Sequence, residues 1–231
     1  MAEVIVALDV REPGEALGLV DRLGDEAGFY KVGLELYTRW GPEAIRELRE
    51  RGKRVFLDLK LHDIPNTVAA AVRAAAEHGV DLLTVHAVGG ARMLEAAAGA
   101  SREVGGPALL SVTILTSMEA RELSTIWGRD VTTMQLEVLR LAELSRDAGM
   151  DGVVASAREA AALRRRLGPA ALLVTPGIRP AGANAHDQTR VATPGEAVRG
   201  GATHLVLGRT ITEAPDPREA LRGILREVAA A

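Results

Sequence analysis

Two acids and a lysine lie within six residues of one another in the run Val55-Phe56-Leu57-Asp58-Leu59-Lys60-Leu61-His62-Asp63. The apolar residues before Asp58 are typical of a buried strand, and alternate residues of a strand project from the same face. Asp58 and Lys60 are therefore expected to lie side by side, with Asp63 shortly after the strand. Charged groups at the end of an apolar strand are costly to remove from water unless they form an ion pair or take part in binding or catalysis. A carboxylate beside an ammonium could stabilise developing charge and transfer a proton.

The same residues could instead form a structural ion pair at the rim of a sheet. Lys31, near the end of an earlier apolar stretch, is expected to add a fourth charge to the group. Four charged groups in one place favour a chemical role, because perturbed titratable groups gather at functional sites.

The elements that must position these residues alternate regularly along the chain. Eight short apolar stretches, separated by stretches typical of helices, are expected to be strands at residues 4–8, 29–32, 54–60, 82–86, 108–113, 152–155, 171–174 and 205–207. Strict alternation of this kind predicts a parallel sheet. Eight such units predict a (β/α)8 TIM barrel that forms one domain over residues 1–231, with a doubly wound open sheet as the alternative.

The positions of the polar residues favour the barrel. Polar residues lie at or just after the ends of at least five expected strands, namely Asp9, Lys31, Asp58, Lys60, His86 and Arg209. A barrel brings all of its strand ends to one mouth, whereas an open sheet spreads many of them apart.

A second group of residues is expected to bind a phosphate. Gly208 and Arg209 follow the last expected strand, where a helix start and a guanidinium would suit a phosphate dianion. The alternative is a surface arginine at the beginning of a helix. Residues 175–194 form a long connection typical of a lid or binding loop. Arg179 and Gln188 in this connection are candidates to close over the same phosphate.

Composition excludes several other classes of protein. The formal net charge is −3 without blocks of like charge, which gives no case for nucleic-acid binding. The chain has no cysteine, and its histidines lack the spacing of a zinc site. No stretch approaches the ~20 apolar residues of a membrane span, and the first residues do not resemble a signal peptide. We therefore expect a cytoplasmic protein that has no zinc site and does not bind a membrane.

Taken together, the motifs resemble those of the orotidine 5′-phosphate decarboxylase family. The most specific is Asp58-x-Lys60-x-x-Asp63-Ile64-Pro65-Asn66-Thr67. Further motifs follow in the family's order, namely Ala7-Leu8-Asp9, Lys31-Val32-Gly33, Thr84-Val85-His86-Ala87, Leu115-Thr116-Ser117, Thr175-Pro176-Gly177-Ile178-Arg179-Pro180, Asp187-Gln188 and Gly208-Arg209. The resemblance spans the whole chain, whose compact length is similar to that of bacterial members. One departure is Thr189, where relatives commonly carry a basic residue.

The resemblance implies decarboxylation of orotidine 5′-phosphate to UMP and CO2, the last step of de novo UMP biosynthesis, without metal or organic cofactor. It implies that Lys60 protonates the carbanion left by CO2, with Asp58 and Asp63 near the substrate carboxylate and Lys31 in the same catalytic group. Binding roles are implied for the ribose (Asp9, Lys31 and Thr67), for the pyrimidine edge (Thr116) and for the phosphate (Arg179, Gln188, Gly208 and Arg209). It also implies a homodimer in which Asp63 and Thr67 enter the neighbouring subunit's site.

Two other functions remain open. Mg²⁺-dependent sugar-phosphate lyases of the same barrel group, such as hexulose-phosphate synthase, share the Asp58-x-Lys60-x-x-Asp63 core. Residues 64–67 and the Asp187-Gln188 pair favour the decarboxylase. A catalytically silent nucleotide-binding barrel would bind UMP without turnover, and the complete charged group argues against it.

Overall fold

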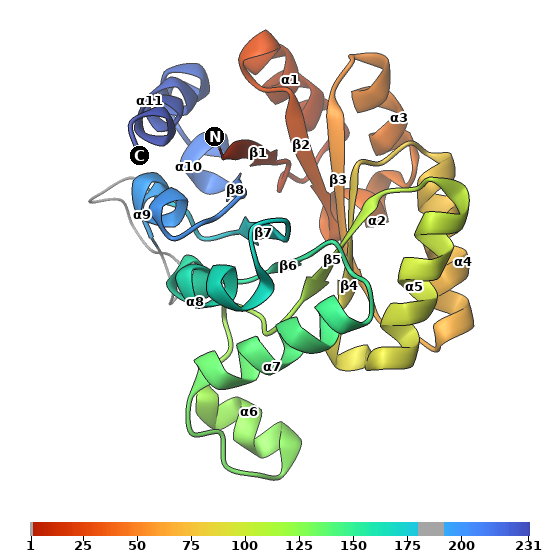
Figure 1. The fold of residues 1–231 in the computed structure, drawn as a ribbon. Helices are drawn as coiled ribbons and strands as arrows, with labels where there is room; N and C mark the ends of the chain where they lie inside the picture. Colours follow the sequence, from red (N-terminus) through yellow and green to blue (C-terminus); the bar gives the residue numbers. More distant parts are fainter. Residues whose placement is uncertain (1, 180–191) are drawn as a thin grey trace.

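The computed structural model describes residues 2–179 and 192–231, and its eight parallel strands form a closed barrel (Figure 1). The strands are β1 (Glu3–Ala7), β2 (Phe29–Gly33), β3 (Arg54–Leu61), β4 (Leu82–His86), β5 (Ala108–Val112), β6 (Gly152–Val154), β7 (Leu172–Thr175) and β8 (His204–Leu207). Each strand pairs with its neighbours in sequence, and β8 pairs with β1 to close the ring. The prediction of a (β/α)8 TIM barrel is confirmed, and the open sheet is wrong.

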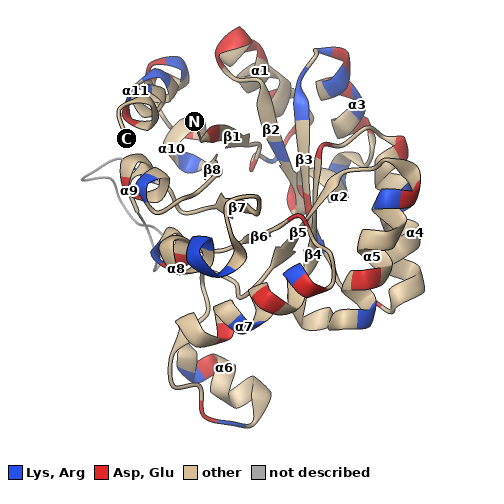
Figure 2. Ribbon diagram, viewed as in Figure 1, with Lys and Arg blue, Asp and Glu red and all other residues tan. Residues whose placement is uncertain are grey.

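Helices surround the strands, and α6 projects away from the barrel at the bottom of the view (Figure 1). The helices are α1 (Pro13–Leu23), α2 (Leu34–Trp40), α3 (Glu43–Glu50), α4 (Pro65–Glu77), α5 (Ala91–Val104), α6 (Ala120–Trp127), α7 (Met134–Asp147), α8 (Ala157–Leu167), α9 (Pro194–Arg199), α10 (Arg209–Thr212) and α11 (Pro217–Ala229), with short 3-10 turns η1 (Gly24–Glu26) and η2 (Ala87–Gly89). In the described part of the chain, none of the helices has the length and apolar character needed to cross a membrane. Figure 2 shows acidic and basic residues interspersed over these helices.

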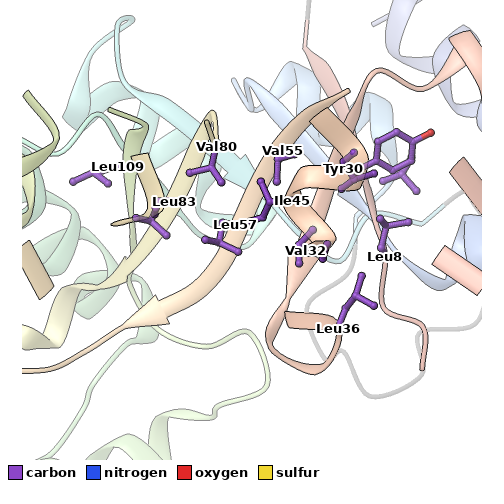
Figure 3. Packing of buried hydrophobic residues seen from close by; sticks show 14 of the residues in the cluster. Leu8, Tyr30, Val32, Leu36, Ile45, Val55, Leu57, Val80, Leu83 and Leu109 are labelled. Atoms are coloured by element: carbon purple, nitrogen blue, oxygen red, sulfur yellow. The ribbon is translucent and has the colours of Figure 1, made fainter. Parts of the chain in front are cut away.

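Alternate residues of each strand build two apolar layers. Inside the barrel, Phe56 packs with apolar side chains of the other strands, such as Phe29 and Leu110. Between barrel and helices, Leu57 and Leu83 belong to the larger apolar cluster shown in Figure 3. Because Phe56 faces inward and Leu57 outward, the alternation directs Asp58 toward the barrel interior at the carboxyl end of β3.

The end of β3 departs from the regular alternation expected from the sequence. Leu57 lies opposite Leu83, whereas Leu61 lies opposite Val85, so β3 contains extra residues relative to β4. This is a bulge, which bends a strand and redirects its side chains. Within it, Lys60 has a φ of 51°, the one positive φ of a non-glycine residue in the described ranges. Such a backbone costs of order 1–3 kcal/mol and persists only where surrounding contacts hold it.

Candidate active site

A cavity of about 470 Å³ lies at the carboxyl ends of the strands. Its volume falls within the roughly 300–1,000 Å³ that is usual for small-molecule sites. Eight of the residues expected at the site from the sequence line this cavity: Asp9, Lys31, Asp58, Lys60, Thr116, Arg179, Gly208 and Arg209. Gln188 lies outside the described residues. The barrel therefore brings together side chains from both ends of the chain.

Four charged side chains from the neighbouring strands β2 and β3 and from the turn after β1 form a chain of alternating sign. Lys60 Nζ lies 2.9 Å from Asp58 Oδ2, and Lys31 Nζ lies 3.8 Å from the same oxygen. Lys31 Nζ also donates a hydrogen bond of 2.8 Å to Asp9 Oδ1. The Asp58 side chain is only 14% exposed, so its carboxylate is held in place by cations rather than by bulk water. This arrangement aims an ammonium, Lys60, into the cavity beside a fixed negative charge.

Gly33 is a site residue whose role sequence reasoning missed. A Cβ at this position would lie 2.8 Å from Lys31 Nζ and 3.2 Å from Asp9 Oδ1. Those distances are too short for a carbon atom to be tolerated without movement of the ion pair. Glycine therefore leaves room for the Lys31–Asp9 contact, and the position of Gly33 two residues after Lys31 was the available signal.

The small number of lysines is a second feature of the sequence that indicates the site. Only three of the 28 basic residues are lysines, namely Lys31, Lys53 and Lys60. Lys53 is buried and donates to the Gly24 carbonyl oxygen at 2.7 Å, outside the cavity. The other two line the cavity. An ammonium can lose its proton in a protein whereas a guanidinium does not, so the two lysines that line the cavity are candidates to transfer a proton.

Two arginines, Arg179 and Arg209, also line the cavity. Arg179 is buried, and its Nη1 donates to Thr210 Oγ1 at 2.9 Å. Its Nε is buried without a hydrogen-bond partner among the described residues. Burial, and next the charge of Arg209, lowers the pKa of the Arg179 guanidinium, while Glu213 acts in the opposite direction. A buried donor beside a second positive charge is suited to binding an anion with two charges.

The remainder of the cavity wall is mostly apolar. It includes Phe56, Val112, Ile114, Val154 and Val206. Apolar walls lower the local dielectric, which strengthens the interaction of Lys60 and Asp58 with any charge that develops beside them.

Asp63 and Thr67 do not line this cavity. They border a neighbouring hollow together with Lys60 and His62. Asp63 is exposed, and its Oδ1 accepts a hydrogen bond of 2.6 Å from the Ile64 N–H. The four-charge group expected from the sequence is thus completed within one subunit by Asp9, and Asp63 lies apart from it.

His86, at the end of β4, does not line the cavity as the structure describes it. Its ring centroid is 5.7 Å from that of His62. Burial first, and then the nearby His62 and Lys60, lowers the pKa of His86 below its usual range. His86 is therefore favoured in its neutral form beside the lysine.

Over residues 2–179 and 192–231, no three His, Asp or Glu side chains gather in a geometry that could hold a metal ion. Asp9 and Asp58 are both in contact with lysine ammonium groups. A divalent cation bound to either carboxylate would have to displace or repel a lysine.

Comparisons with known proteins agree with this geometry. Residues 2–224 match the family model described as orotidine 5′-phosphate decarboxylase / HUMPS family. A curated orotidine 5′-phosphate decarboxylase of Moorella thermoacetica is 52% identical over 232 residues, which cover 98% of this chain and 92% of the relative. Its counterpart from Alkalilimnicola ehrlichii is also 52% identical, over 99% of this chain and 97% of the relative. The crystal structure of orotidine 5′-phosphate decarboxylase from Lactobacillus acidophilus superposes with a TM-score of 0.88 and 38% identity, covering 99% of both chains.

Proposed function

The chain belongs to the orotidine 5′-phosphate decarboxylase / HUMPS family, and on that premise we propose that it converts orotidine 5′-phosphate to UMP and CO2, the last step of de novo UMP synthesis. One observation carries the proposal. The same cavity is lined by a lysine–carboxylate chain and by a pair of arginines. A nucleotide that bears a phosphate at one end and a carboxylate on its base matches both. The percentage identity to named decarboxylases favours this reaction over a Mg²⁺-dependent sugar-phosphate lyase.

The reaction requires a group that stabilises and then protonates a carbanion. When the bond between the ring carbon and the carboxylate breaks, its electron pair stays on the ring carbon, in the plane of the ring. The Lys60 ammonium would face this charge and donate a proton to the carbon, and the resulting amine would regain a proton from water. Asp58 holds the ammonium at 2.9 Å, so the donor is already oriented before the substrate reacts.

Repulsion between the substrate carboxylate and an aspartate carboxylate of the site would contribute only part of the rate enhancement. Two like charges ~4 Å apart at an effective dielectric of ~20 repel by about 4 kcal/mol. Relief of that repulsion as CO2 leaves would account for about three powers of ten in rate. The remainder must come from the preorganised charge of Lys60 and from binding energy supplied by the distant phosphate.

The binding roles that we propose are those implied by the resemblance to the family, and most of the residues concerned line the cavity. Asp9 and Lys31 would bind the ribose hydroxyls, and Thr116 would contact the pyrimidine edge. The phosphate-binding residues would be Arg179, Gly208 and Arg209, together with Gln188. Phosphate binding by arginine is favoured because its guanidinium can donate two parallel hydrogen bonds.

The first test is to follow UMP formation from orotidine 5′-phosphate with and without EDTA. We expect turnover that EDTA leaves unchanged, because the lysines supply the positive charge that a metal would otherwise provide. UMP binding without turnover at micromolar enzyme would support the silent barrel. Activity that EDTA abolishes and Mg²⁺ restores would support the lyase instead.

We also propose that the protein forms a homodimer through the mouth of the barrel next to β3. Three exposed apolar side chains follow the adjacent strands β2, β3 and β4, namely Leu34, Ile64 and Val88. Ile64 is 66% exposed and lies next to Asp63. Exposed apolar side chains that cluster in this way are typical of an interface. In such a dimer, Asp63 and Thr67 would enter the partner subunit's cavity.

Co-expression of two inactive variants tests the shared site. A dimer of Lys60→Ala and Asp63→Ala subunits has one cavity with both defects and one with neither. We expect the mixture to recover about a quarter of wild-type activity, because half of the dimers are mixed and each has one intact site. As a matched control, Lys60→Ala with Asp58→Ala should recover nothing. Failure of the first pair to recover activity would place Asp63 in its own subunit's site.

A further inference from the structure

We infer that Thr84 is a positioning residue that holds Asp58 and Lys60 in their reactive arrangement. This inference rests on the proposed function and deepens it, because it names the group that maintains the catalytic pair. Thr84 lies on β4, adjacent to the bulge of β3, and its side chain is completely buried. A buried hydroxyl must have hydrogen-bond partners, and both of its partners belong to the catalytic pair.

The two hydrogen bonds have defined directions. The Lys60 backbone N–H donates to Thr84 Oγ1 at 2.8 Å, because an amide N–H can act only as a donor. The one proton of the hydroxyl is then available for Asp58 Oδ1, which lies 2.9 Å away. Thr84 therefore accepts from the main chain of one catalytic residue and donates to the side chain of the other.

The contact with Asp58 fixes how the carboxylate is turned. Its Oδ1 is taken by the hydroxyl of Thr84, and its Oδ2 faces the Lys60 ammonium at 2.9 Å. Without the hydroxyl, the carboxylate could rotate so that both oxygens compete for the two lysines. Thr84 thereby leaves Asp58 Oδ2 available to the proposed proton donor, Lys60.

The contact with Lys60 supports the unusual backbone. Lys60 has a positive φ, and it lies where the register between β3 and β4 shifts. Its N–H is bound by a side chain, and this bond is one of the contacts that can hold a strained conformation in place. The threonine hydroxyl thus controls both the direction of the lysine side chain and the orientation of its carboxylate partner.

Three substitutions at this position separate the hydroxyl from the methyl group. Thr84→Val keeps the shape and removes the hydroxyl, whereas Thr84→Ser keeps the hydroxyl and removes the methyl group. Thr84→Ala removes both. Misplacement of reacting groups by ~1 Å can cost about 10²-fold in rate. We therefore expect Thr84→Val and Thr84→Ala to lower kcat by about a hundredfold, with KM and the Kd of UMP changed by less than about threefold. Thr84→Ser should stay within about fivefold of the wild-type kcat.

Controls distinguish this role from a general effect on packing. The serine and alanine variants lose the same methyl group and differ only in the hydroxyl, so they decide the question even if the valine variant does not fold. Thr113→Val removes another buried hydroxyl, which donates to the Val154 carbonyl oxygen at 3.2 Å, and should leave kcat unchanged. The inference is wrong if serine loses as much kcat as alanine, or if valine keeps the wild-type kcat. Absence of turnover in the wild-type protein would overturn the proposed function itself, which is a separate result.

Discussion

Lys60→Ala should lower kcat by at least about 10⁴-fold while UMP still binds. General acid catalysis contributes typically about 10²–10⁴-fold, and preorganised electrostatic stabilisation about 10²–10³-fold for each group. Lys60 would supply both effects, because in the proposed mechanism the same ammonium faces the developing charge and donates the proton. Loss of the side chain also leaves Asp58, which is only 14% exposed, with Lys31 as its remaining cation at 3.8 Å. Initial rates of UMP formation, with calorimetry for UMP binding, measure both consequences.

Replacement of Lys60 by arginine distinguishes the role of its transferable proton from the role of its positive charge. Lys60→Arg keeps a positive charge, but a guanidinium remains protonated under all ordinary conditions. We therefore expect this variant to lose at least about 10²-fold in kcat, the smaller contribution of general acid catalysis. Lys53→Arg is the matched control, since the Lys53 ammonium donates to the Gly24 carbonyl oxygen and does not line the cavity. A Lys60→Arg enzyme with wild-type kcat would show that the proton comes from another group.

Arg209→Ala should lower kcat/KM by about 10²–10⁴-fold. Hydrogen bonds to charged groups contribute about 1.5–3 kcal/mol each, and an arginine can make two to a phosphate. Arg179 would remain, but it is buried and already donates to Thr210, so it does not replace the lost contacts. Because binding energy from the phosphate also serves the chemical step, kcat/KM is expected to change more than UMP binding alone would indicate.

Orotidine, which lacks the phosphate, provides the sharpest control for this prediction. If Arg209 acts through the phosphate, wild type and Arg209→Ala should decarboxylate orotidine at nearly equal kcat/KM. Arg222→Ala removes an exposed arginine that pairs with Glu26 at 2.8 Å, and it should leave both substrates unaffected. An equal loss with orotidine and with its 5′-phosphate would place the effect of Arg209 elsewhere in the site.

The apolar pattern of the chain predicted alternating strands and helices, and the polar residues at the strand ends favoured a closed barrel over an open sheet. Short buried strands and intervening helices differ in their periodicity, which depends on local geometry and can be read without a structure. The strand ends then predicted which side chains share one mouth, and Asp9, Lys31, Asp58 and Arg209 do line one cavity. The helix after β3 begins at Pro65, because proline is well suited to the first position of a helix.

Contacts that depend on strand register could not be predicted in this way. Regular alternation correctly placed Lys60 beside Asp58, yet the bulge and the positive φ of Lys60 arise from the pairing of β3 with β4. The same pairing brings Thr84 to the catalytic pair, although 24 residues separate Thr84 from Lys60. The steric role of Gly33 likewise appears only when the positions of Lys31 and Asp9 are known.

The residues from Val55 to Thr67 illustrate both kinds of information. By itself, the sequence determined that this stretch is a strand followed by a helix and that it carries two acids and a lysine with the spacing of a decarboxylase motif. Only the tertiary structure decided that Asp58 and Lys60 face the cavity while Asp63 and Thr67 border a separate hollow. The physical reason is that residue type and spacing are local properties, whereas the direction of each side chain depends on how neighbouring strands pair and where that pairing shifts.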